Sequence, residues 1–536
     1  MKHTHKTLMH IVCMMFAYTA QAQDSLQTLP NSNPALYHSK QNTELSVGYF
    51  SASSSRERIT QLGDGGRTLD IEASSYRRLG DTDNVWGYAA YSNRRRDNVR
   101  WNENSDFLRL YPYVLGDARG GNLHGEQYVL YGGYNKTVRL GSTDADSTLG
   151  KMQDLGEHLT RQQRHATSLK YGFELGYRAL SEYRQQDPRP NNTTAFIHGK
   201  AGLGFQFSNS QVALALNAGK YKQTCEFVYM NELGSQIEYH ITGVGNDFTR
   251  FAGSNNNTFY KGYVFGGQVD YMYRLSSDNA LSFSACTEHG SYEKILSDLN
   301  RLPLNRLNVN RFTGEISWQH SDKTAILMRI EAYDRNGFDN VFGDATGNIY
   351  PKIGSRRQYE GNSMTASLSA LQRFILNNGT STANGRTTLA LLPSVAYNSF
   401  EGKHLGSGNF MRYENIIYGI DVNAVFSLRR SKFTARAGLH RRNCMKHEAD
   451  VAESKNTDVA ESVLIADNYL SSGETMLTAS LRYDYRLGNG YGLFVEVMWT
   501  HNPTLALMMP RNDSQHVMQI ETCADNVFGA KIGITL

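Results

Sequence analysis

The chain closes with the stretch NVFGAKIGITL, residues 526–536, and this stretch decides the fold class. Apolar side chains alternate there with small or polar residues, at Phe528, Ala530, Ile532, Ile534 and Leu536. An extended strand with this pattern has one apolar face and one polar face. A terminal strand of this kind is typical of a transmembrane β-barrel, in which closure leaves no backbone group unpaired in lipid. We therefore expect an all-β protein with a single antiparallel barrel in a bacterial outer membrane.

The first residues indicate export from the cytoplasm. Lys2 and Lys6 precede an apolar stretch at residues 8–18, and Ala20-Gln21-Ala22 follows as a small-residue cleavage motif. These features together predict a secretory signal peptide rather than a membrane span. Cys13 lies within the apolar stretch without a small residue directly before it, which disfavours a lipoprotein signal. We expect a signal peptide at residues 1–22, a periplasmic or lumenal segment at residues 23–43 and the barrel at residues 44–536.

Composition excludes other classes of protein. No mature segment reaches the roughly 18 apolar residues of a membrane helix, and the mean hydropathy of −0.50 also excludes a helical bundle in lipid. The 32 Tyr and 48 Gly against only 10 Pro favour many strands joined by polar turns. The net charge of +4 arises from 55 basic and 51 acidic residues, a balance that does not indicate nucleic acid as a partner.

The mature chain contains four cysteines, none of them in a CxxC pair, at Cys225, Cys286, Cys444 and Cys523. A disulfide is one interpretation, and isolated packed thiols are the simpler one.

Alternation of apolar and polar residues predicts strands within residues 169–179, 259–275, 416–428, 477–487 and 491–499. Very short polar turns alternate along the chain with long polar stretches, as expected for short periplasmic turns and long extracellular loops. The long stretches are residues 53–67, 97–125, 183–192, 224–257, 293–308, 337–359, 402–412, 445–472 and 501–524. This plan gives about 18 strands, with 16 as the alternative. Residues 141–165 break it, because a turn is expected there; residues 155–164 form either a short helix or no fixed structure.

Inward positions of the predicted strands carry many charges of both signs. We take as lumen-lining candidates Lys170, Glu174, Arg178, Asp270, Arg274, Asp421, Arg482, Asp484, Arg486 and Glu496, and Arg329, Glu331 and Arg436 share their side. Such charges either form ion pairs that brace the wall, which is the simpler interpretation, or line a path for a solute. A barrel of roughly 18 strands is too wide for side chains to fill, so water, a loop or a plug must occupy it.

The stretch at residues 97–125 contains too many aromatic residues for a plain surface loop. Trp101, Phe107, Tyr111 and Tyr113 are the plug candidates, and Leu115 follows them. Because burial of such side chains is favourable, we expect this loop to fold into the barrel mouth and to narrow or close it.

Catalytic and metal sites are not indicated. Neither GxSxG nor HExxH occurs, so we predict no enzyme, no catalytic, cofactor-binding or metal residue and no cofactor. The loop histidines His404 and His447 leave metal or haem capture as an alternative, although single loop histidines are usually only solvated. For Arg94-Arg95-Arg96 a solvated rim is favoured over the docking of an anionic surface lipid.

Two resemblances add to these expectations. Asn33-Pro34-Ala35 resembles the mature amino terminus of fatty-acid-channel-type barrels, in which this tripeptide starts a segment that reaches into the lumen, although Asn-Pro is also an ordinary turn opener. The second involves LYPYVLGD at residues 110–117, Gly120-Gly121, Gly132-Gly133-Tyr134 and DPRPN at residues 187–191. These motifs resemble the uncharacterised outer-membrane β-barrel family of the Bacteroidota that is defined by a domain of unknown function. That resemblance implies a Bacteroidota outer-membrane protein and supplies no substrate.

Taken together, we expect an integral outer-membrane barrel that acts as a channel or an accessory protein in surface uptake of a solute. The alternative is a non-transporting structural or interaction barrel that partners a secretion complex or a TonB-dependent receptor complex. The expected partners are outer-membrane lipid and lipopolysaccharide, the barrel-assembly machinery, and a TonB-dependent receptor or a surface lipoprotein.

Overall fold

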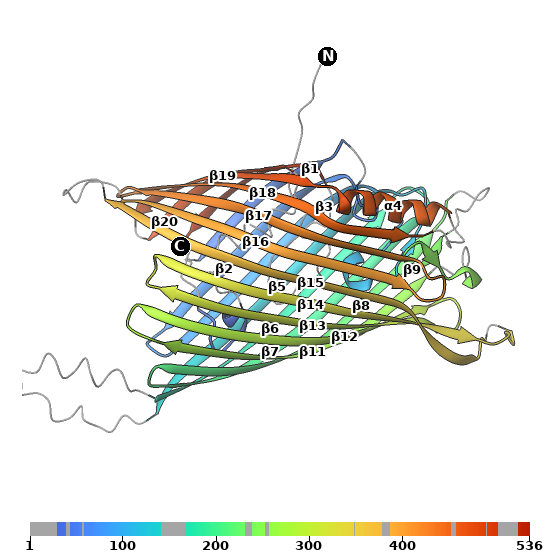
Figure 1. The fold of residues 1–536 in the computed structure, drawn as a ribbon, viewed down its shortest axis with the longest axis horizontal. Coiled ribbons are helices and arrows are strands. Elements are labelled where there is room, and N and C mark those ends of the chain that lie inside the picture. Colours follow the sequence, from blue (N-terminus) through green and yellow to red (C-terminus); the bar gives the residue numbers. More distant parts are fainter. Residues whose placement is uncertain are drawn as a thin grey trace, which may run out of the picture.

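The computed structural model describes residues 29–38, 43–55, 58–140, 167–230, 238–251, 257–347, 349–377, 386–451, 457–488, 490–501 and 524–536. Within these residues, 18 strands form one closed antiparallel barrel (Figure 1). The strands are β1 Glu44–Ser53, β2 Gly65–Leu79, β3 Asp83–Val99, β5 Gly121–Leu140, β6 Thr167–Arg184, β7 Arg189–Phe207, β8 Ser210–Val228, β11 Thr258–Arg274, β12 Asn279–Leu296, β13 Leu302–His320, β14 Thr324–Phe342, β15 Lys352–Asn377, β16 Arg386–His404, β17 Phe410–Ser427, β18 Ser431–Asp450, β19 Glu474–Gly488, β20 Tyr491–His501 and β21 Asn526–Thr535.

Each strand pairs with the next along the chain, and the last pairs with the first. The β1–β21 ladder runs from Glu44 opposite Thr535 to Ser53 opposite Asn526. The barrel closes through its carboxyl-terminal strand, the fold is all-β, and the barrel has 18 strands rather than 16. These findings confirm the sequence predictions.

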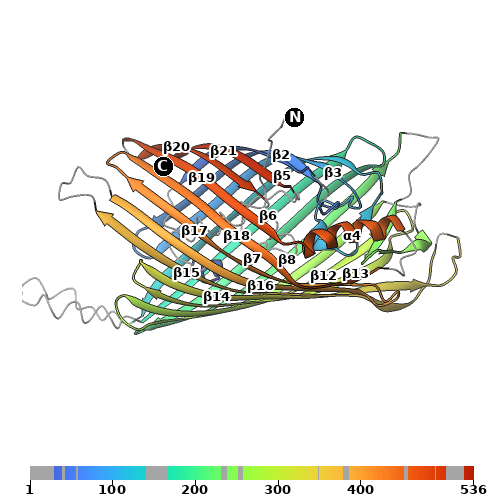
Figure 2. The ribbon, with the colours of Figure 1, turned by 45° about the horizontal axis from the view of Figure 1, so that its top comes forward.

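The two ends of the barrel differ. One, here called the turn end, carries the short connections at residues 80–82, 208–209, 275–278, 321–323 and 428–430, whereas the opposite loop end carries the longer ones (Figures 1 and 2). Several predicted loops are shorter than expected: residues 293–308 reduce to a connection at 297–301, and residues 183–192 to one at 185–188. At the loop end these strands continue through backbone hydrogen bonds alone and need no apolar face. The sequences of the strand ends are therefore polar and resemble the sequences of loops. The irregular connection predicted at residues 141–165 lies outside the described residues.

The outer surface of the barrel is apolar and the inner surface is polar. In β11, Tyr263, Phe265 and Val269 are exposed on the outside, whereas Gln268 and Asp270 are buried on the inside. This is the alternation expected where lipid contacts one face of each strand. In the described part of the chain, no helix has both the length and the apolar character to cross a membrane.

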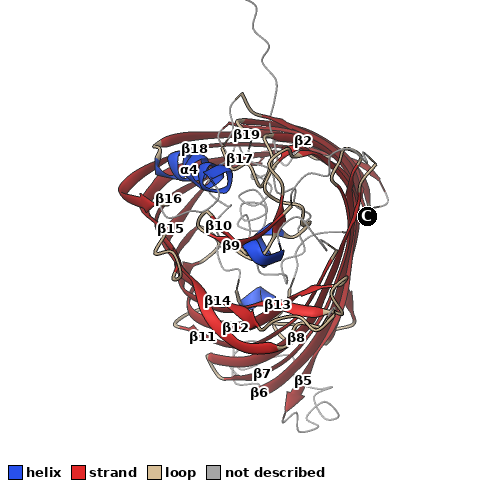
Figure 3. Cartoon of the chain, turned by 90° about the vertical axis from the view of Figure 1, so that its right-hand side faces the viewer, coloured by secondary structure: helices blue, strands red, loops and turns tan. Residues whose placement is uncertain are grey.

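Smaller elements lie inside the loop end. The strands β4, Leu115–Gly116, β9, Tyr239–Gly243, and β10, Asn246–Asp247, form a three-stranded sheet with β9 at its centre. The helix α2 spans Phe107–Leu110, α4 spans Thr457–Ser471 and the short helix η3 spans Thr249–Phe251. The short helix η1, Pro30–Ser32, lies further along the lumen, where Ser32 bonds to Gln268 of β11. Figure 3, a view along the barrel, shows β9, β10 and α4 within the ring of strands. The long connection expected at residues 445–472 is present, but β18 continues to Asp450 and the connection contains the helix α4, which the sequence interpretation did not include.

Candidate functional site: the occupied lumen

Two loops build a compact body in the loop end of the barrel. We call this body, residues 101–117 and 239–247, the inner plug. The pairing of β4 with β9 joins its two parts, with Leu115 opposite His240 and Gly116 opposite Tyr239. In addition, the backbone N–H of Ile241 donates to the carbonyl of Val114 at 3.0 Å. The plug is therefore held together by backbone hydrogen bonds between segments more than a hundred residues apart in sequence.

The four plug candidates from the sequence lie in this body. Trp101 is 4% exposed, Phe107 7% and Tyr113 2%, and all three belong to one buried hydrophobic cluster with side chains of the wall and of α4. Tyr111 is partly buried against the same cluster, with its ring perpendicular to that of Tyr359 on β15 at 5.9 Å between centroids. Burial of these rings is the main favourable contribution to plug docking.

Charges fix the plug to the wall, with acids on the plug and bases on the strands. Arg178 Nη1 and Nη2 on β6 donate to Asp106 Oδ1 and Oδ2 at 2.8 and 2.5 Å, a bidentate pair. Six residues further along β6, Arg184 Nη2 lies 2.8 Å from Glu103 Oε1 and 2.9 Å from Asp117 Oδ2. These contacts determine where the plug sits on the inner wall, because each buried charge is costly without its partner.

Backbone carbonyls of the plug accept hydrogen bonds from two further cationic side chains of the wall. Arg335 on β14 donates to the carbonyls of Tyr111 and Leu108 at 2.9 and 2.7 Å. Lys294 on β12 donates to the carbonyl of Val114 at 3.0 Å. These bonds satisfy carbonyl groups that would otherwise be buried without partners.

Arg109 is a cation of the plug itself. Its guanidinium carbon lies 4.6 Å from the ring centroid of Phe196 and 5.0 Å from that of Tyr221. Its Nη1 also donates to the hydroxyl of Tyr292 at 3.3 Å. The aromatic lining of β7, β8 and β12 thus forms a pocket for this arginine through cation–π contacts.

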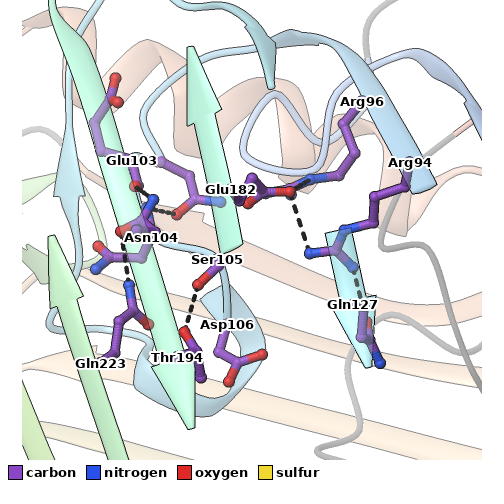
Figure 4. A network of polar contacts seen from close by, with 12 residues as sticks. Arg94, Arg96, Glu103, Asn104, Ser105, Asp106, Gln127, Glu182, Thr194 and Gln223 are labelled. Carbon is purple, nitrogen blue, oxygen red and sulfur yellow. Dashed lines mark hydrogen bonds and ion pairs between the residues drawn. The ribbon is translucent and has the colours of Figure 1, made fainter. Parts of the chain in front are cut away.

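A second ion network lies within the wall next to the plug (Figure 4). Glu182 on β6 accepts from Arg94 Nη2 at 3.1 Å and from Arg96 Nη2 at 2.7 Å, and all three side chains are buried. In the same view, Ser105 of the plug lies 2.8 Å from Thr194 on β7, hydroxyl to hydroxyl. The interpretation of Arg94-Arg95-Arg96 as a solvated rim was wrong for Arg94 and Arg96, because alternate residues of a strand share a face and these two face inward.

The plug acids have strongly shifted pKa values. Burial raises the pKa of Glu103 well above its usual value, and the Arg184 charge offsets this only in part. Burial also acts on Asp117, but its hydrogen bond with Glu103 and the charge of Arg184 hold its pKa below the usual value. For Asp106, the charge and hydrogen bond of Arg178 outweigh burial and keep its pKa low.

A separate segment, residues 29–37, lies against the inner wall. Asn33 Nδ2 donates to Asp270 Oδ2 at 2.8 Å, and Gln268 Nε2 donates to the carbonyl of Leu29 at 2.7 Å. The ring of Tyr37 stacks on Trp86 of β3 at 4.4 Å between centroids. Asn33-Pro34-Ala35 thus lies in the lumen.

The lumen-lining candidates separate into two groups. Eight have inward contacts: Lys170 with Gln211, Glu174 with Trp86, Arg178 with Asp106, Asp270 with Asn33, Asp421 with His440, and Arg482 with Asp484 and, at 3.8 Å, with Glu496. Arg274 and Arg486 are instead exposed near the ends of β11 and β19. A further layer joins Arg311 to Glu331 at 2.5 Å and to Glu288 at 3.1 Å. The inner charges are thus largely paired with one another or with lumenal segments.

The histidines and cysteines singled out in the sequence make ordinary contacts in the structure. His404 lies 3.0 Å from the hydroxyl of Ser407, and His447 pairs with Asp467 of α4 at 2.5 Å. Cys225, Cys286 and Cys444 are unpaired thiols, while Cys523 lies outside the described residues. No group of three potential metal ligands occurs in the part of the chain that the structure describes.

Sequence reasoning missed the residues that hold the plug in place. Glu103 and Asp106 belong to no motif, Asp117 only ends the LYPYVLGD stretch, and their partners Arg178 and Arg184 are distant in sequence. The one available signal was the strand period, which places Arg178, Glu182 and Arg184 on one inward face of β6.

Several solved structures match this chain at low similarity. The ferric yersiniabactin uptake receptor FyuA from Yersinia pestis matches with a TM-score of 0.38 and 8% identity, over 93% of this chain and 81% of that one. The siderophore receptor PirA from Acinetobacter baumannii matches with a TM-score of 0.34 and 8% identity, over 93% of this chain and 81% of that one. The translocator domain of the autotransporter NalP from Neisseria meningitidis matches with a TM-score of 0.23 and 11% identity, over 61% of this chain and 88% of that one.

A comparison with curated proteins found no match. Residues 34–142 and 161–524 match the family of unknown function DUF6850, and the chain therefore belongs to that family.

Proposed function

We propose that this protein is an integral outer-membrane barrel of a Bacteroidota bacterium that takes part in the uptake of a solute at the cell surface, as a channel that is closed at rest. In this proposal the signal peptide at residues 1–22 directs export and the loop end faces the outside. The outer surface supports the location, because exposed apolar side chains such as Phe265 and Leu216, at 55% and 73%, need lipid to cover them.

The docked plug is the observation that carries the proposal. It lies in the loop end and packs against the wall through its own aromatic core and through ion pairs. Beyond it, the inner wall is polar and charged, as expected for a path that water and solutes occupy when the plug moves. Lipid and lipopolysaccharide would surround the barrel, the assembly machinery would insert it, and a TonB-dependent receptor or a surface lipoprotein would be its working partner.

One observation favours the alternative of a non-transporting barrel that partners a secretion or receptor complex. The lumen is occupied twice, by the inner plug and by residues 29–37, and most inner charges are paired. A permanent scaffold would have the same features.

Excision of the plug tip distinguishes the two functions. The base of the loop is a short ladder, in which Trp101 N–H donates to the Asp117 carbonyl at 3.0 Å and Glu103 N–H to the Leu115 carbonyl at 2.8 Å. Replacement of residues 104–114 by Asn-Gly would therefore reconnect adjacent strands through a tight turn. We expect wild-type protein to show little conductance in planar bilayers and the excised variant to form stable open channels.

The D106N variant serves as a graded control. It retains the whole loop but weakens the pair with Arg178, and we expect brief openings rather than a permanent channel. Both variants must first show the heat-modifiable gel migration of a folded barrel. Absence of conductance in a folded excised variant would contradict the channel and favour the scaffold.

A further inference from the structure

An apolar cavity lies between the inner plug, α4 and the wall strands β14 to β17. It measures about 90 Å³, within a hollow of about 1010 Å³ that includes open solvent. Its lining is mainly aromatic and aliphatic and includes Trp101, Tyr111, Tyr359, Phe400, Met411 and Ala466. An apolar cavity does not hold ordered water well, and a cavity of about 150 Å³ accepts a benzene ring. The enclosed part is smaller than that, but the hollow extends beyond it, so the two together can take the apolar part of a small molecule.

Arg335 gives this cavity a positive charge. It lines the cavity, and its two Nη atoms donate to the carbonyls of Tyr111 and Leu108. Within the described residues it forms no ion pair, whereas Arg178 and Arg184 each face a plug carboxylate. Arg335 is partly buried and its partners are neutral carbonyls, so an anion beside it would be favoured.

Tyr359 supplies a second polar group. The residue is fully buried, and its hydroxyl has no hydrogen-bond partner among the described residues. A Cβ added at Gly361, the next inward residue on β15, would lie 2.7 Å from this hydroxyl, so the glycine provides the room in which the end of the Tyr359 ring lies. A buried hydroxyl without a partner is costly, so an acceptor brought to it would be favoured.

From these observations we propose that the cavity is a binding site for a small apolar monocarboxylate, whose hydrocarbon part lies against the aromatic lining and whose carboxylate faces Arg335 and the Tyr359 hydroxyl. The inference rests on the proposed function in that the bound acid would be the captured solute, and it names the chemical class of that solute. A charge-assisted hydrogen bond to an arginine and a second bond from a phenol are what such a carboxylate requires.

Bound ligand would also stabilise the closed plug. Residues of the plug, of α4 and of the wall meet in this one cavity, and Ile59 and Leu62 of the β1–β2 connection complete it. A ligand that contacts all of these elements binds the docked plug better than the undocked one, so occupancy should favour the closed state.

The test is calorimetric titration of the full-length folded barrel in a neutral detergent with benzoate and isovalerate as probes, and with benzyl alcohol as the neutral comparison. We expect saturable 1:1 binding of the acids and binding of benzyl alcohol at least tenfold weaker. The Trp101 ring lines the cavity, so its fluorescence should change on titration, and the change should disappear in W101F.

Two variants separate the parts of the proposal. A466L adds a side chain from α4 into the cavity and should abolish binding of all three probes, whereas Y359F removes only the hydroxyl and should weaken acid binding about five- to tenfold. No saturable acid binding, or acid binding unchanged in A466L, would overturn the site. Equal affinity for benzyl alcohol and benzoate together with an unaffected Y359F would overturn the carboxylate.

These outcomes are independent of transport. If the excised barrel conducts while benzoate does not bind to wild type, the channel stands and the ligand class fails. If benzoate binds and A466L abolishes binding but no variant conducts, the site stands and the uptake function fails.

Discussion

Two wall glycines determine where the amino-terminal segment can lie. A Cβ at Gly172 would be 2.5 Å from the carbonyl oxygen of Pro34, and one at Gly202 would be 2.1 Å from Asn33 Oδ1. Both positions face inward on neighbouring strands, β6 and β7, so the absence of side chains leaves a shallow track for residues 33–35. Here glycine serves close approach of two backbones rather than a turn.

We predict that G172A displaces this segment. The new methyl group would collide with backbone atoms of Pro34, which cannot rotate away, whereas G204A would meet nothing closer than 3.4 Å. In limited proteolysis of the purified barrel, residues 29–38 should be cleaved in G172A and protected in wild type and G204A. Equal protection in both variants would show that the segment adapts to the extra methyl group.

The outward and inward faces should respond differently to charge. Phe265 is exposed on the outer surface, so F265R would place a cation in lipid and should destabilise the barrel by about 2–4 kcal/mol near the midplane. The matched inward change D421N keeps a polar side chain beside His440 and should be much milder. Urea unfolding in vesicles measures both, and equal losses would mean that the assigned faces are wrong.

At the scale of elements, α4 and the inner plug depend on each other. The hydroxyl of Tyr469 on α4 accepts from Arg58 Nη1 at 2.9 Å, and its carbonyl accepts from Arg442 Nη2 at 2.8 Å. Val459 and Ala466 of the same helix join the aromatic cluster of the plug. A helix of this length gains most of its stability from such packing.

The stability of docking should fall as pH rises from about 4.5 to 8. Burial raises the pKa of Glu238, next to β9, from 4.5 to about 8; Asp117 raises it further, while Tyr229 and Arg184 act against the shift. Between these values the docked state holds more protons than the undocked state, so its stability decreases with pH.

Hydrogen exchange of residues 239–247 at pH 6 and pH 9 measures this. We expect faster exchange at pH 9 beyond the intrinsic chemical effect, and a smaller difference in E238Q, whose amide does not ionise. Slower exchange at pH 9 than expected from the intrinsic chemical effect would mean that docking becomes more stable as pH rises, which would contradict this prediction.

The whole molecule depends on closure. β21 is hydrogen-bonded to β20 on one side and to β1 on the other, and it is the only element that joins the two ends of the chain of strands within the described residues. Without it, both neighbours would present unpaired backbone groups to lipid.

Deletion of residues 528–536 should therefore abolish insertion. We expect loss of heat-modifiable migration on gels and accumulation outside the membrane fraction. Deletion of residues 29–38 is the matched control, because it removes lumenal contacts but leaves the β1–β21 ladder intact. Normal assembly of the first variant would mean that the remaining strands close without β21.

The sequence by itself determined the barrel. Period-two alternation at residues 526–536, 259–275 and 416–428 reflects a constraint that acts on each strand separately, because each has one side toward an apolar surface and one toward a polar lumen. The alternation of short and long connections then gave the strand number, and the aromatic residues of 97–125 indicated a loop that needs cover. These features are local, so local patterns were enough to find them.

Only the tertiary structure decided what fills the barrel. The pairing of Leu115 with His240, the contact of Arg184 with Glu103 and Asp117, and the cavity beside Arg335 and Tyr359 each join segments far apart in sequence. α4 was missed because its apolar residues face a plug that the sequence does not locate, and inward-facing Arg94 and Arg96 were mistaken for a rim because their partner Glu182 is on another strand. Such contacts carry no periodic signal, since closure of the barrel, and not the neighbouring residues, brings them together.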